Sequence, residues 1–327
     1  MAASEIYASR GKRYGDVTTK RVLVTGASGF VGRPLVAALL QAGYAVRAAT
    51  RRPVSFPSSV DVVIVPDFKT TVDWEPILRG VDVVIHLAGL AHADSRAAAF
   101  GAFDQVNLLT TLNLARAAKD VGLDRFIFIS SVRAQIGASS TQLVREQDEP
   151  HPTDDYGRSK LAAELAVRST GLPFTILRPV AIYGPHPKGN IKTLVRLATS
   201  PLLLPFKGFN NRRSLLGIDN LIATIFFVLN NQSTVGEKFL VADPVPFTLP
   251  DLFTMLRKAQ GRKPGMVYVP PIIIRLALWL SGQSRLWKHI SGNLVVNTGK
   301  LESLGWRPAV ETYEGLRSVL AAENGEG

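Results

Sequence analysis

The chain contains no cysteine, and this absence is its most restrictive compositional feature. Without cysteine there can be no disulfide framework, no thiolate metal site and no thiol nucleophile, so zinc fingers and cysteine-dependent hydrolases are excluded. The absence also agrees with a reducing compartment, and we expect a cytoplasmic protein. The five histidines show no metal-ligand spacing, so we predict no metal site.

Acidic residues are scarce relative to basic ones. The 327 residues include 38 lysines and arginines but 26 aspartates and glutamates, which gives a net charge of +12. Such a charge favours anionic partners, whether nucleotides, nucleic acids or acidic lipids, and it does not choose among them. With 46% apolar and 20% charged residues, the chain is typical of a globular protein, long enough for one large α/β unit or two fused parts.

Long apolar runs are also missing. Residues 1–20 are basic and lack the apolar core of a secretory signal, so we interpret them as a mobile basic tail. The most apolar segment, residues 267–280, is interrupted by Pro270, Pro271 and Arg275 and is shorter than the ~20 residues that span a bilayer. We expect a core or surface helix there. A peripheral membrane contact stays open, because its basic side can meet anionic headgroups.

Short β-branched segments alternate with helical segments from Arg21 onward. The expected strands cover residues 22–24, 45–48, 60–65, 81–86, 126–129, 174–177 and 235–241. Between them, residues 34–40 and 108–118 carry apolar side chains at three- and four-residue spacing, as amphipathic helices do. This alternation predicts an α/β fold with a Rossmann-type, doubly wound parallel sheet. Proline and glycine punctuate the chain after Pro179, which predicts a smaller C-terminal lobe.

A glycine-rich turn follows the first expected strand. Its residues are Thr25, Gly26, Ala27, Ser28, Gly29, Phe30, Val31 and Gly32. Gly26 permits a tight turn, Gly29 lets the backbone approach a pyrophosphate, and Gly32 lets the next helix pack close to the strand. The amino end of that helix favours phosphate groups. Because the turn joins an expected strand to an expected helix, we predict a dinucleotide site; the alternative is that the glycines serve packing alone.

The end of the second expected strand offers Thr50, Arg51 and Arg52 and no acidic residue. An acid at this place holds the ribose hydroxyls of NAD, whereas a guanidinium pairs with the 2′-phosphate of NADP. We therefore expect NAD(P)H as cofactor, with NADP favoured over NAD. An ordinary solvated arginine pair is the alternative.

Tyr156 and Lys160 stand four residues apart near the start of an expected helix. This spacing places both side chains on one helical face, where the ammonium can lie beside the phenol and favour its ionised form. Tyr156 is therefore a candidate general acid/base. Ser131 follows the strand at 126–129, at the edge where parallel sheets bind ligands, and can hydrogen-bond a substrate carbonyl. Together these residues indicate a catalytic site rather than a surface pair.

These residues resemble the extended short-chain dehydrogenase/reductases, also called the NAD-dependent epimerase/dehydratase family, which act on nucleotide sugars. The similarity spans about residues 22–320. Its motifs are the glycine turn, Asp67-Phe68, His86-Leu87-Ala88-Gly89, Ser131, Tyr156-Gly-Arg-Ser-Lys160 and Arg178-Pro179, followed by Tyr183-Gly184-Pro185, Lys188-Gly189-Asn190, Asn211-Arg212-Arg213-Ser214 and Asp219-Asn220. The resemblance implies a dinucleotide-binding Rossmann domain at 21–180 plus about 214–242. It implies a nucleotide-sugar-binding lobe at 181–213 plus about 243–321.

The resemblance also implies roles for individual residues. The cofactor would contact Gly26, Ser28, Gly29, Phe30, Val31, Gly32, Arg51, Arg52, Asp67, Phe68, Leu87, Ala88, Gly89, Tyr156, Lys160 and Pro179, and the substrate would contact Ser131, Asn190, Arg212 and Arg213. Asp67 and Phe68 would lie at the adenine, and Lys160 would also hold the nicotinamide ribose. Arg213, helped by Asn190, would grip the nucleotide diphosphate, which a guanidinium fork suits well. An exposed basic pair at Arg212 and Arg213 is the alternative.

Departures from the family pattern narrow the implied chemistry. Family dehydratases carry an acid pair directly after the strand-end Ser or Thr, where this chain has Val132 and Arg133. Family epimerases commonly carry an asparagine where Ala181 stands, and they hold NAD through the acid that is missing here. We therefore expect NAD(P)H-dependent reduction of the C4 keto group of a UDP-4-keto-6-deoxy sugar, of the UDP-N-acetylquinovosamine type, for bacterial O-antigen and lipopolysaccharide biosynthesis.

In the expected reaction, Tyr156 protonates the C4 oxygen while Ser131 holds it. A UDP-sugar 4-epimerase is the alternative, and a non-catalytic dinucleotide-binding or RNA-associated protein is a further one. The resemblance implies a UDP-sugar partner and a homodimer formed through helices near 108–118 and 160–168, and we expect no nucleic-acid partner.

Overall fold

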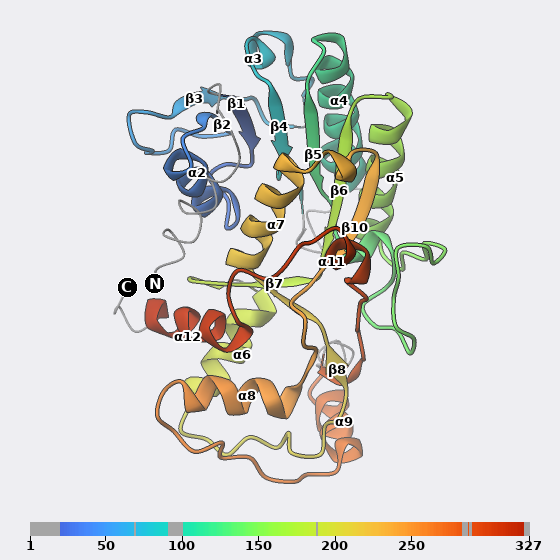
Figure 1. The fold of residues 1–327 in the computed structure, drawn as a ribbon. Coiled ribbons are helices and arrows are strands. Elements are labelled where there is room, and N and C mark those ends of the chain that lie inside the picture. Colours follow the sequence, from blue (N-terminus) through green and yellow to red (C-terminus); the bar gives the residue numbers. More distant parts are fainter. Residues whose placement is uncertain are drawn as a thin grey trace.

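The computed structural model describes residues 20–323 except 69, 91–100, 188, 283–286, 288 and 289. All but the last residue of the expected basic tail lie outside the described residues. A seven-stranded parallel sheet forms the centre of the fold (Figure 1). Its strands, in spatial order, are β10 (Glu237–Val241), β6 (Phe174–Pro179), β5 (Arg125–Ile129), β4 (Val83–His86), β1 (Arg21–Thr25), β2 (Ala45–Thr50) and β3 (Asp61–Ile64). The expected α/β fold with a Rossmann-type sheet is confirmed.

The chain builds this sheet outward from its centre. From β1 it proceeds through β2 to β3 at one edge, returns to β4 beside β1, and continues through β5 and β6 to β10 at the other edge. All neighbouring pairs are parallel. Because the order reverses between β1 and β4, the crevice at their carboxyl ends is the place where such sheets bind ligands.

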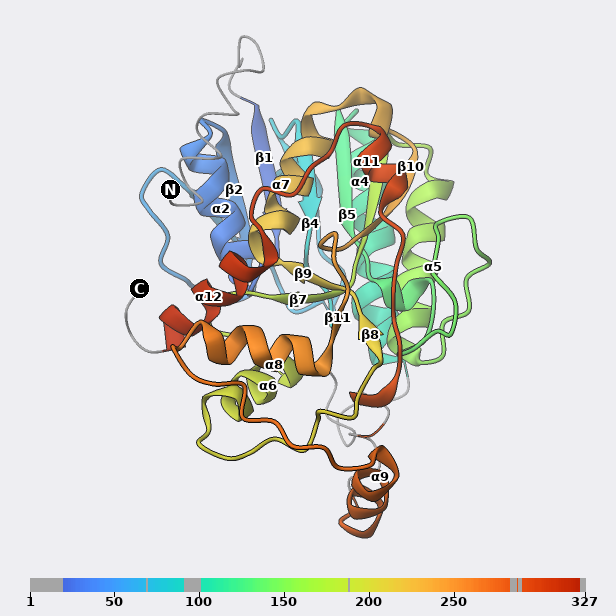
Figure 2. The same ribbon diagram turned by 60° about the horizontal axis from the view of Figure 1, so that its bottom comes forward.

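Helices cover both faces of the sheet (Figures 1 and 2). The helices α2 (Gly32–Gln41) and α7 (Ile218–Asn230) pack on one face, and α4 (Thr110–Asp120) and α5 (Asp155–Ser169) pack on the other. Val22 joins Leu35 of α2 in one core cluster, whereas Leu23 joins Leu114 of α4 in the other. Successive residues of β1 therefore supply opposite cores, as the alternation of a strand requires.

Short elements connect the larger ones. They are α3 (Glu75–Leu78), the π-helical turn η1 (Asp104–Leu109), the 3₁₀ turns η2 (Val132–Ala134) and η3 (Gln232–Thr234), and α11 (Gly299–Ser303). The turn η1 runs directly into α4, so the helix expected over residues 108–118 starts in a wider, π-helical form.

A second lobe lies below the sheet in Figure 1. It contains the parallel pair β7 (Ala181–Tyr183) and β9 (Leu215–Gly217), the antiparallel pair β8 (Arg212–Arg213) and β11 (Phe247–Thr248), and the helices α6 (Gly189–Thr199), α8 (Leu249–Lys258), α9 (Pro271–Leu280) and α12 (Thr312–Glu323). It has its own apolar cluster, to which Phe253 of α8 and Leu316 of α12 belong. None of the helices in the described ranges combines the length and apolarity needed to cross a bilayer.

The last part of the described chain contacts both cores. Leu301 and Trp306 are buried in the cluster that α2 and α7 form with the sheet. Val319 and Leu320, on the following helix α12, are buried in the cluster of the second lobe. One C-terminal segment thus joins the cluster on the α2 and α7 face of the sheet to the cluster of the second lobe.

Candidate active site

The glycine turn connects β1 to α2 beside the crevice between β1 and β4. Gly26 has φ of +69°, and a Cβ there would lie 2.9 Å from the backbone nitrogen of Ala88. A Cβ on Gly32 would lie only 2.3 Å from the carbonyl oxygen of Gly26. The amide of Gly29 donates to that same oxygen at 2.9 Å. Only glycine fits at both ends of this turn, so the backbone is held in a tight loop at the sheet edge.

The start of α2 suits an anion. Within the described part of the chain, no side chain caps this helix, so its first amides are not satisfied by a capping group. Ser28 and Gly29 are exposed, and Phe30 and Val31 are half-buried. These features fit the pyrophosphate of a dinucleotide, which the amides of this turn would hold.

The far end of this crevice is lined by the ends of β2 and β3. Arg51 and Arg52 are both exposed directly after β2. Asp67 is exposed after β3, but Phe68 is only 5% exposed and packs against Trp74 with ring centroids 6.3 Å apart. The side chain of Phe68 therefore belongs to the core, and Asp67 is the member of this pair whose side chain reaches the surface.

Tyr156 lies in the first turn of α5. Asp154 precedes the helix and caps it by accepting a hydrogen bond from the amide of Gly157 at 2.7 Å. The ring of Tyr156 is half-buried, and this burial raises the pKa of its hydroxyl. A side-chain hydrogen bond with Ser131 and the nearby Arg133 guanidinium lower that pKa, while Asp154 raises it. Ser131 and Tyr156 are thus brought together, as expected.

Lys160 is buried one turn further along α5. Its Nζ donates to the carbonyl oxygen of Ile129 at 2.8 Å and lies 4.2 Å from the ring centroid of Phe128. Burial lowers the pKa of Lys160 to about 7, and the Glu164 carboxylate opposes that shift. The expected influence of this ammonium on the Tyr156 hydroxyl is not among the causes of the Tyr156 shift. A buried ammonium needs acceptors, and the end of β5 supplies one.

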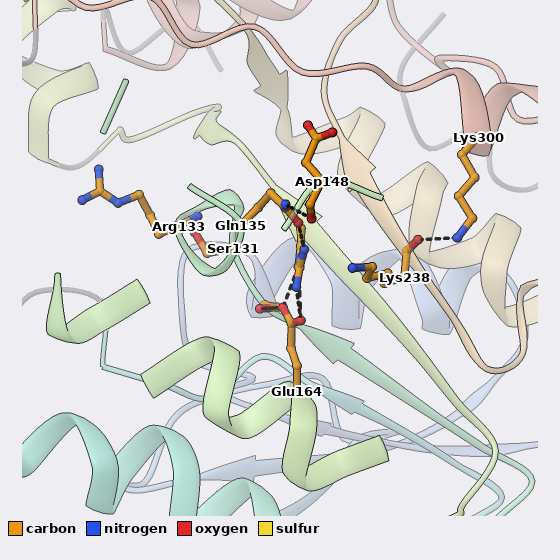
Figure 3. A network of polar contacts seen from close by, with 9 residues as sticks. Ser131, Arg133, Gln135, Asp148, Glu164, Lys238 and Lys300 are labelled. Atoms are coloured by element: carbon orange, nitrogen blue, oxygen red, sulfur yellow. Dashed lines mark hydrogen bonds and ion pairs between the residues drawn. The ribbon is translucent and has the colours of Figure 1, made fainter. Parts of the chain in front are cut away.

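A buried ion pair lies behind these residues. Arg178 donates from Nε to Glu164 at 2.9 Å and from Nη2 to the other carboxylate oxygen at 2.5 Å. Ser130 also donates to Glu164, and Gln135 accepts from Arg178. Figure 3 shows the side chains of Gln135 and Glu164 within this network. Because Glu164 is one helical turn from Lys160, the network fixes the part of α5 that presents Lys160 to β5.

His86 connects three elements without serving as an acid or base. Its Nδ1 lies 2.6 Å from the hydroxyl of Thr25 on β1, and its Nε2 lies 2.9 Å from the hydroxyl of Thr111 on α4. Burial, assisted by the charge of Lys160, lowers the pKa of His86 to about 3. The imidazole is therefore neutral at physiological pH. Among the described residues, no three metal-ligating side chains gather closely enough to hold a metal ion.

Asn107 is a site residue that the sequence did not reveal. It is 1% exposed in η1, where its Oδ1 accepts from the amide of Leu90 at 2.7 Å and its Nδ2 donates to the hydroxyl of Ser159 at 3.0 Å. A Cβ on Gly89 would lie 3.1 Å from Asn107 Oδ1 and 3.8 Å from Lys160 Nζ. Asn107 thus ties the segment after β4, where Leu87, Ala88 and Gly89 lie, to α5. An isolated asparagine before a helix gave no signal of this contact.

Arg133 is a second residue without an expected role. It forms an ion pair with Asp154, and in Figure 3 its side chain extends away from Gln135 and Glu164. The charge of Arg133 lowers the pKa of Tyr156. Burial is the main cause that lowers the pKa of Arg213, and the charge of Arg133 lowers it further. The charge of Arg133 is thus felt both at Tyr156 and at Arg213 of the second lobe.

The expected substrate residues differ in burial and in their hydrogen bonds. Arg213 is half-buried and donates to the carbonyl oxygens of Gly292 at 2.8 Å and Ala138 at 3.1 Å. Arg212 is exposed on the same short strand, and the side chain of Asn190 lies outside the described residues. Pro179 is buried at the end of β6. Of the two neighbouring arginines, Arg213 is thus the one whose guanidinium is held by backbone carbonyls.

Comparison with known proteins agrees with this geometry. The model of the NAD dependent epimerase/dehydratase family matches residues 22–242. The chain is 32% identical to a UDP-glucose 4-epimerase of Vibrio cholerae over 315 residues, 93% of this chain and 95% of that protein. It is 34% identical to a ceramide reductase of Caulobacter vibrioides over 314 residues, 93% of this chain and 91% of that one.

Solved structures show the same fold. A UDP-glucuronic acid 4-epimerase from Bacillus cereus, in complex with NAD, superposes with a TM-score of 0.73 at 23% identity. The match covers 94% of this chain and 100% of that chain. At this level of identity the likeness concerns the arrangement of the two lobes and the sheet.

Proposed function

The chain belongs to the NAD-dependent epimerase/dehydratase family, and from that premise we propose that it catalyses hydride transfer at C4 of a UDP-sugar. The observation that carries the proposal is the hydrogen bond between Tyr156 and Ser131 at the sheet edge, with Lys160 buried one turn further along α5 and a nearby turn that fits a dinucleotide. Arg213 supports a diphosphate-bearing substrate, because it is a half-buried guanidinium of the second lobe that backbone carbonyls hold in place.

The residues of the site have distinct tasks in this reaction. A nicotinamide dinucleotide held at the glycine turn supplies or accepts the hydride. Tyr156 gives its proton to the C4 oxygen during reduction and takes it back during oxidation. The hydroxyl of Ser131 holds the same oxygen by a hydrogen bond and favours ionisation of Tyr156. Lys160, with a pKa of about 7, places a partly populated positive charge at the end of β5.

Reduction of a UDP-4-keto-6-deoxy sugar by NADPH is the form of this reaction that we favour. Arg51 and Arg52 are exposed at the end of β2, where they can meet a 2′-phosphate, and no acid takes the place that suits NAD. A reductase releases its cofactor after each turnover, as a carrier of biosynthetic reducing power must. A reductase is also present among the relatives of about one-third identity. We also propose that the product serves surface polysaccharide synthesis. The protein would form a homodimer through α4 and α5.

UDP-sugar 4-epimerisation is the second candidate, and it is favoured by the similarity to the Vibrio cholerae enzyme along almost the whole chain. An epimerase removes hydride from C4, lets the keto sugar turn, and returns hydride to the opposite face. Tyr156 and Ser131 would act on the same oxygen in both directions.

Two assays on the purified protein separate these candidates. Consumption of NADPH with a UDP-4-keto-6-deoxy-N-acetylhexosamine, followed by absorbance, supports reduction. Interconversion of UDP-glucose and UDP-galactose without net consumption of cofactor supports epimerisation. A protein that binds the dinucleotide and performs neither reaction would be a non-catalytic binding protein, contrary to the proposal.

The variant Tyr156→Phe tests the general acid/base directly. We expect kcat to fall by about 10² to 10⁴ in whichever reaction is found, with cofactor affinity nearly unchanged, because only the proton donor is removed. The matched control is Tyr44→Phe, since the Tyr44 hydroxyl donates to Asn230 at 3.2 Å on the surface. Full activity of Tyr156→Phe would assign the proton transfer to another group.

A further inference from the structure

The helix α9 is apolar around its circumference and is nevertheless exposed. Arg275 is the only charged residue in its sequence, Pro-Ile-Ile-Ile-Arg-Leu-Ala-Leu-Trp-Leu. None of its ten residues, all of which are described, is buried. A helix that is hydrophobic on all sides is ordinarily covered by a protein core or by lipid. Its exposure therefore indicates a partner that covers it.

We call the exposed apolar side chains of α9 and of the neighbouring loop the α9 patch. It consists of Leu202, Leu203, Ile272, Leu276, Trp279 and Leu280, whose side chains are 54–72% exposed. Ile272, Leu276 and Trp279 share one side of α9, because their spacing is four and three residues. Leu202 and Leu203 lie beside the segment that leads into α9, since the amide of Leu204 donates to the carbonyl oxygen of Gly265 at 2.9 Å.

The lobe that carries the patch also carries the charge of the protein. Its residues, 181–213 and 243–321, contain sixteen lysines and arginines against five acidic residues, a net charge of +11 out of the +12 of the whole chain. No aspartate or glutamate occurs between residues 252 and 301. Lys207, Lys263 and Arg275 are exposed, and the amide of Lys207 is bound at 3.3 Å to the carbonyl of Val267 just before α9. Exposed basic side chains thus stand on α9 and on the segments next to it.

We propose that the α9 patch docks on an anionic lipid surface, with α9 lying in the plane of the membrane interface. An apolar helix among basic side chains is the pattern that binds such surfaces, because apolar burial and attraction to acidic headgroups add. Trp279 suits the boundary between headgroups and acyl chains. A second copy of the chain is a poorer occupant, since two lobes of the same charge repel each other.

The position of α9 agrees with this role. Figures 1 and 2 both place it at the end of the second lobe away from the sheet, and in Figure 2 it projects beyond α6 and α8. At ten residues it is about 15 Å long, enough to lie along an interface but not to cross it. This docking does not rest on the proposed reaction, because the patch is separate from the residues of the candidate active site.

Vesicle flotation of the full chain tests the proposal. We expect the protein to float with vesicles of phosphatidylcholine mixed with phosphatidylglycerol, and to float much less with phosphatidylcholine alone or at high salt, which screens the charges. The double variant Leu276→Ser and Trp279→Ser should lower the partition coefficient at least about tenfold. The matched control, Ile64→Ser and Val245→Ser, removes side chains that are each 54% exposed outside the patch and should bind as the wild type does.

Three outcomes overturn the proposal. The first is absence of flotation by the wild type, and the second is equal flotation of the patch variant, whose fold is checked by circular dichroism. The third is a dimer in sedimentation velocity that the patch variant abolishes, which would assign the patch to a second copy. A separate charge variant, Lys263→Glu with Arg275→Glu, should weaken binding to the acidic vesicles several-fold. Unchanged binding of that variant would refute the electrostatic part.

Discussion

Gly32 is the position at which one added methyl group conflicts most with the turn. In Gly32→Ala the Cβ would lie 2.3 Å from the carbonyl oxygen of Gly26, so the backbone must move apart. We expect the affinity for NAD(P)H to fall at least about tenfold, as measured by fluorescence titration, because the amides lose their arrangement around the phosphates. The control Gly43→Ala, at the other end of α2, has φ of +87° but no described atom within 4 Å of the new Cβ. It should lose stability, about 1 kcal/mol, and keep its cofactor.

Arg51 and Arg52 should determine the preference for NADPH over NADH. If their guanidinium groups pair with the 2′-phosphate, the variant Arg51→Ser with Arg52→Ser should bind NADPH at least about tenfold more weakly and bind NADH almost as before. Dissociation constants for both cofactors give the ratio. Equal losses for both would mean that the pair is an ordinary solvated surface.

The carboxylate of Glu164 influences the pKa of Lys160. It raises that pKa against the larger effect of burial, which has lowered it to about 7. In Glu164→Gln the negative charge is gone, so the pKa of Lys160 should fall further, and the limb of the kcat/KM profile that follows Lys160 should move to lower pH. The control is Glu237→Gln, because Glu237 pairs with Lys300 at 2.5 Å away from the site. An unmoved limb would show that Lys160 does not govern this profile.

At the scale of elements, Asp243 joins strands and helices of both lobes. Its carboxylate accepts from the hydroxyl of Tyr183 at 2.7 Å, from Asn220 Nδ2 at 2.8 Å, from the amide of Gly217 at 3.1 Å and from the hydroxyl of Thr312 at 3.1 Å. The variant Asp243→Ala removes the acceptor that these four buried donors share, and of them Tyr183 and Asn220 keep one other acceptor each. We expect the free energy of unfolding to fall by about 3–5 kcal/mol, measured with urea.

A surface acid provides the comparison. Asp251 takes part in a capping box with Thr248 at the start of α8, where both are accessible to water. Asp251→Ala should cost only about 1 kcal/mol. If both variants lose the same free energy of unfolding, the buried contacts of Asp243 contribute no more to stability than a surface cap does.

The regular elements of the sheet were predictable, because apolar β-branched segments and amphipathic spacing are local properties of the chain. The glycine turn, Ser131 and the first turn of α5 were predictable for the same reason. Asn107 was not, since a π-helical turn has no distinct apolar period and the contact with Ser159 joins segments about fifty residues apart. The hydrogen bond of Lys160 to the carbonyl oxygen of Ile129 was not predictable either, because which carbonyl accepts from a buried ammonium depends on tertiary packing.

At the scale of the whole molecule, the charge is distributed unevenly. The second lobe carries nearly all of the net charge, and a UDP-sugar is an anion, so encounter should be accelerated by attraction. We expect kcat/KM to fall several-fold as ionic strength rises to physiological values and beyond, while kcat changes little. Steady-state kinetics over a salt series measures both constants. A kcat/KM independent of salt would exclude steering by this lobe.

The C-terminal segment that contributes Trp306 to one core cluster and Val319 to the other has a consequence for how the protein unfolds. Neither cluster can lose its structure without withdrawing side chains that the same short stretch anchors in its neighbour. The two lobes should therefore denature together in a single cooperative transition. A chain that ends before this stretch should lose stability in both lobes.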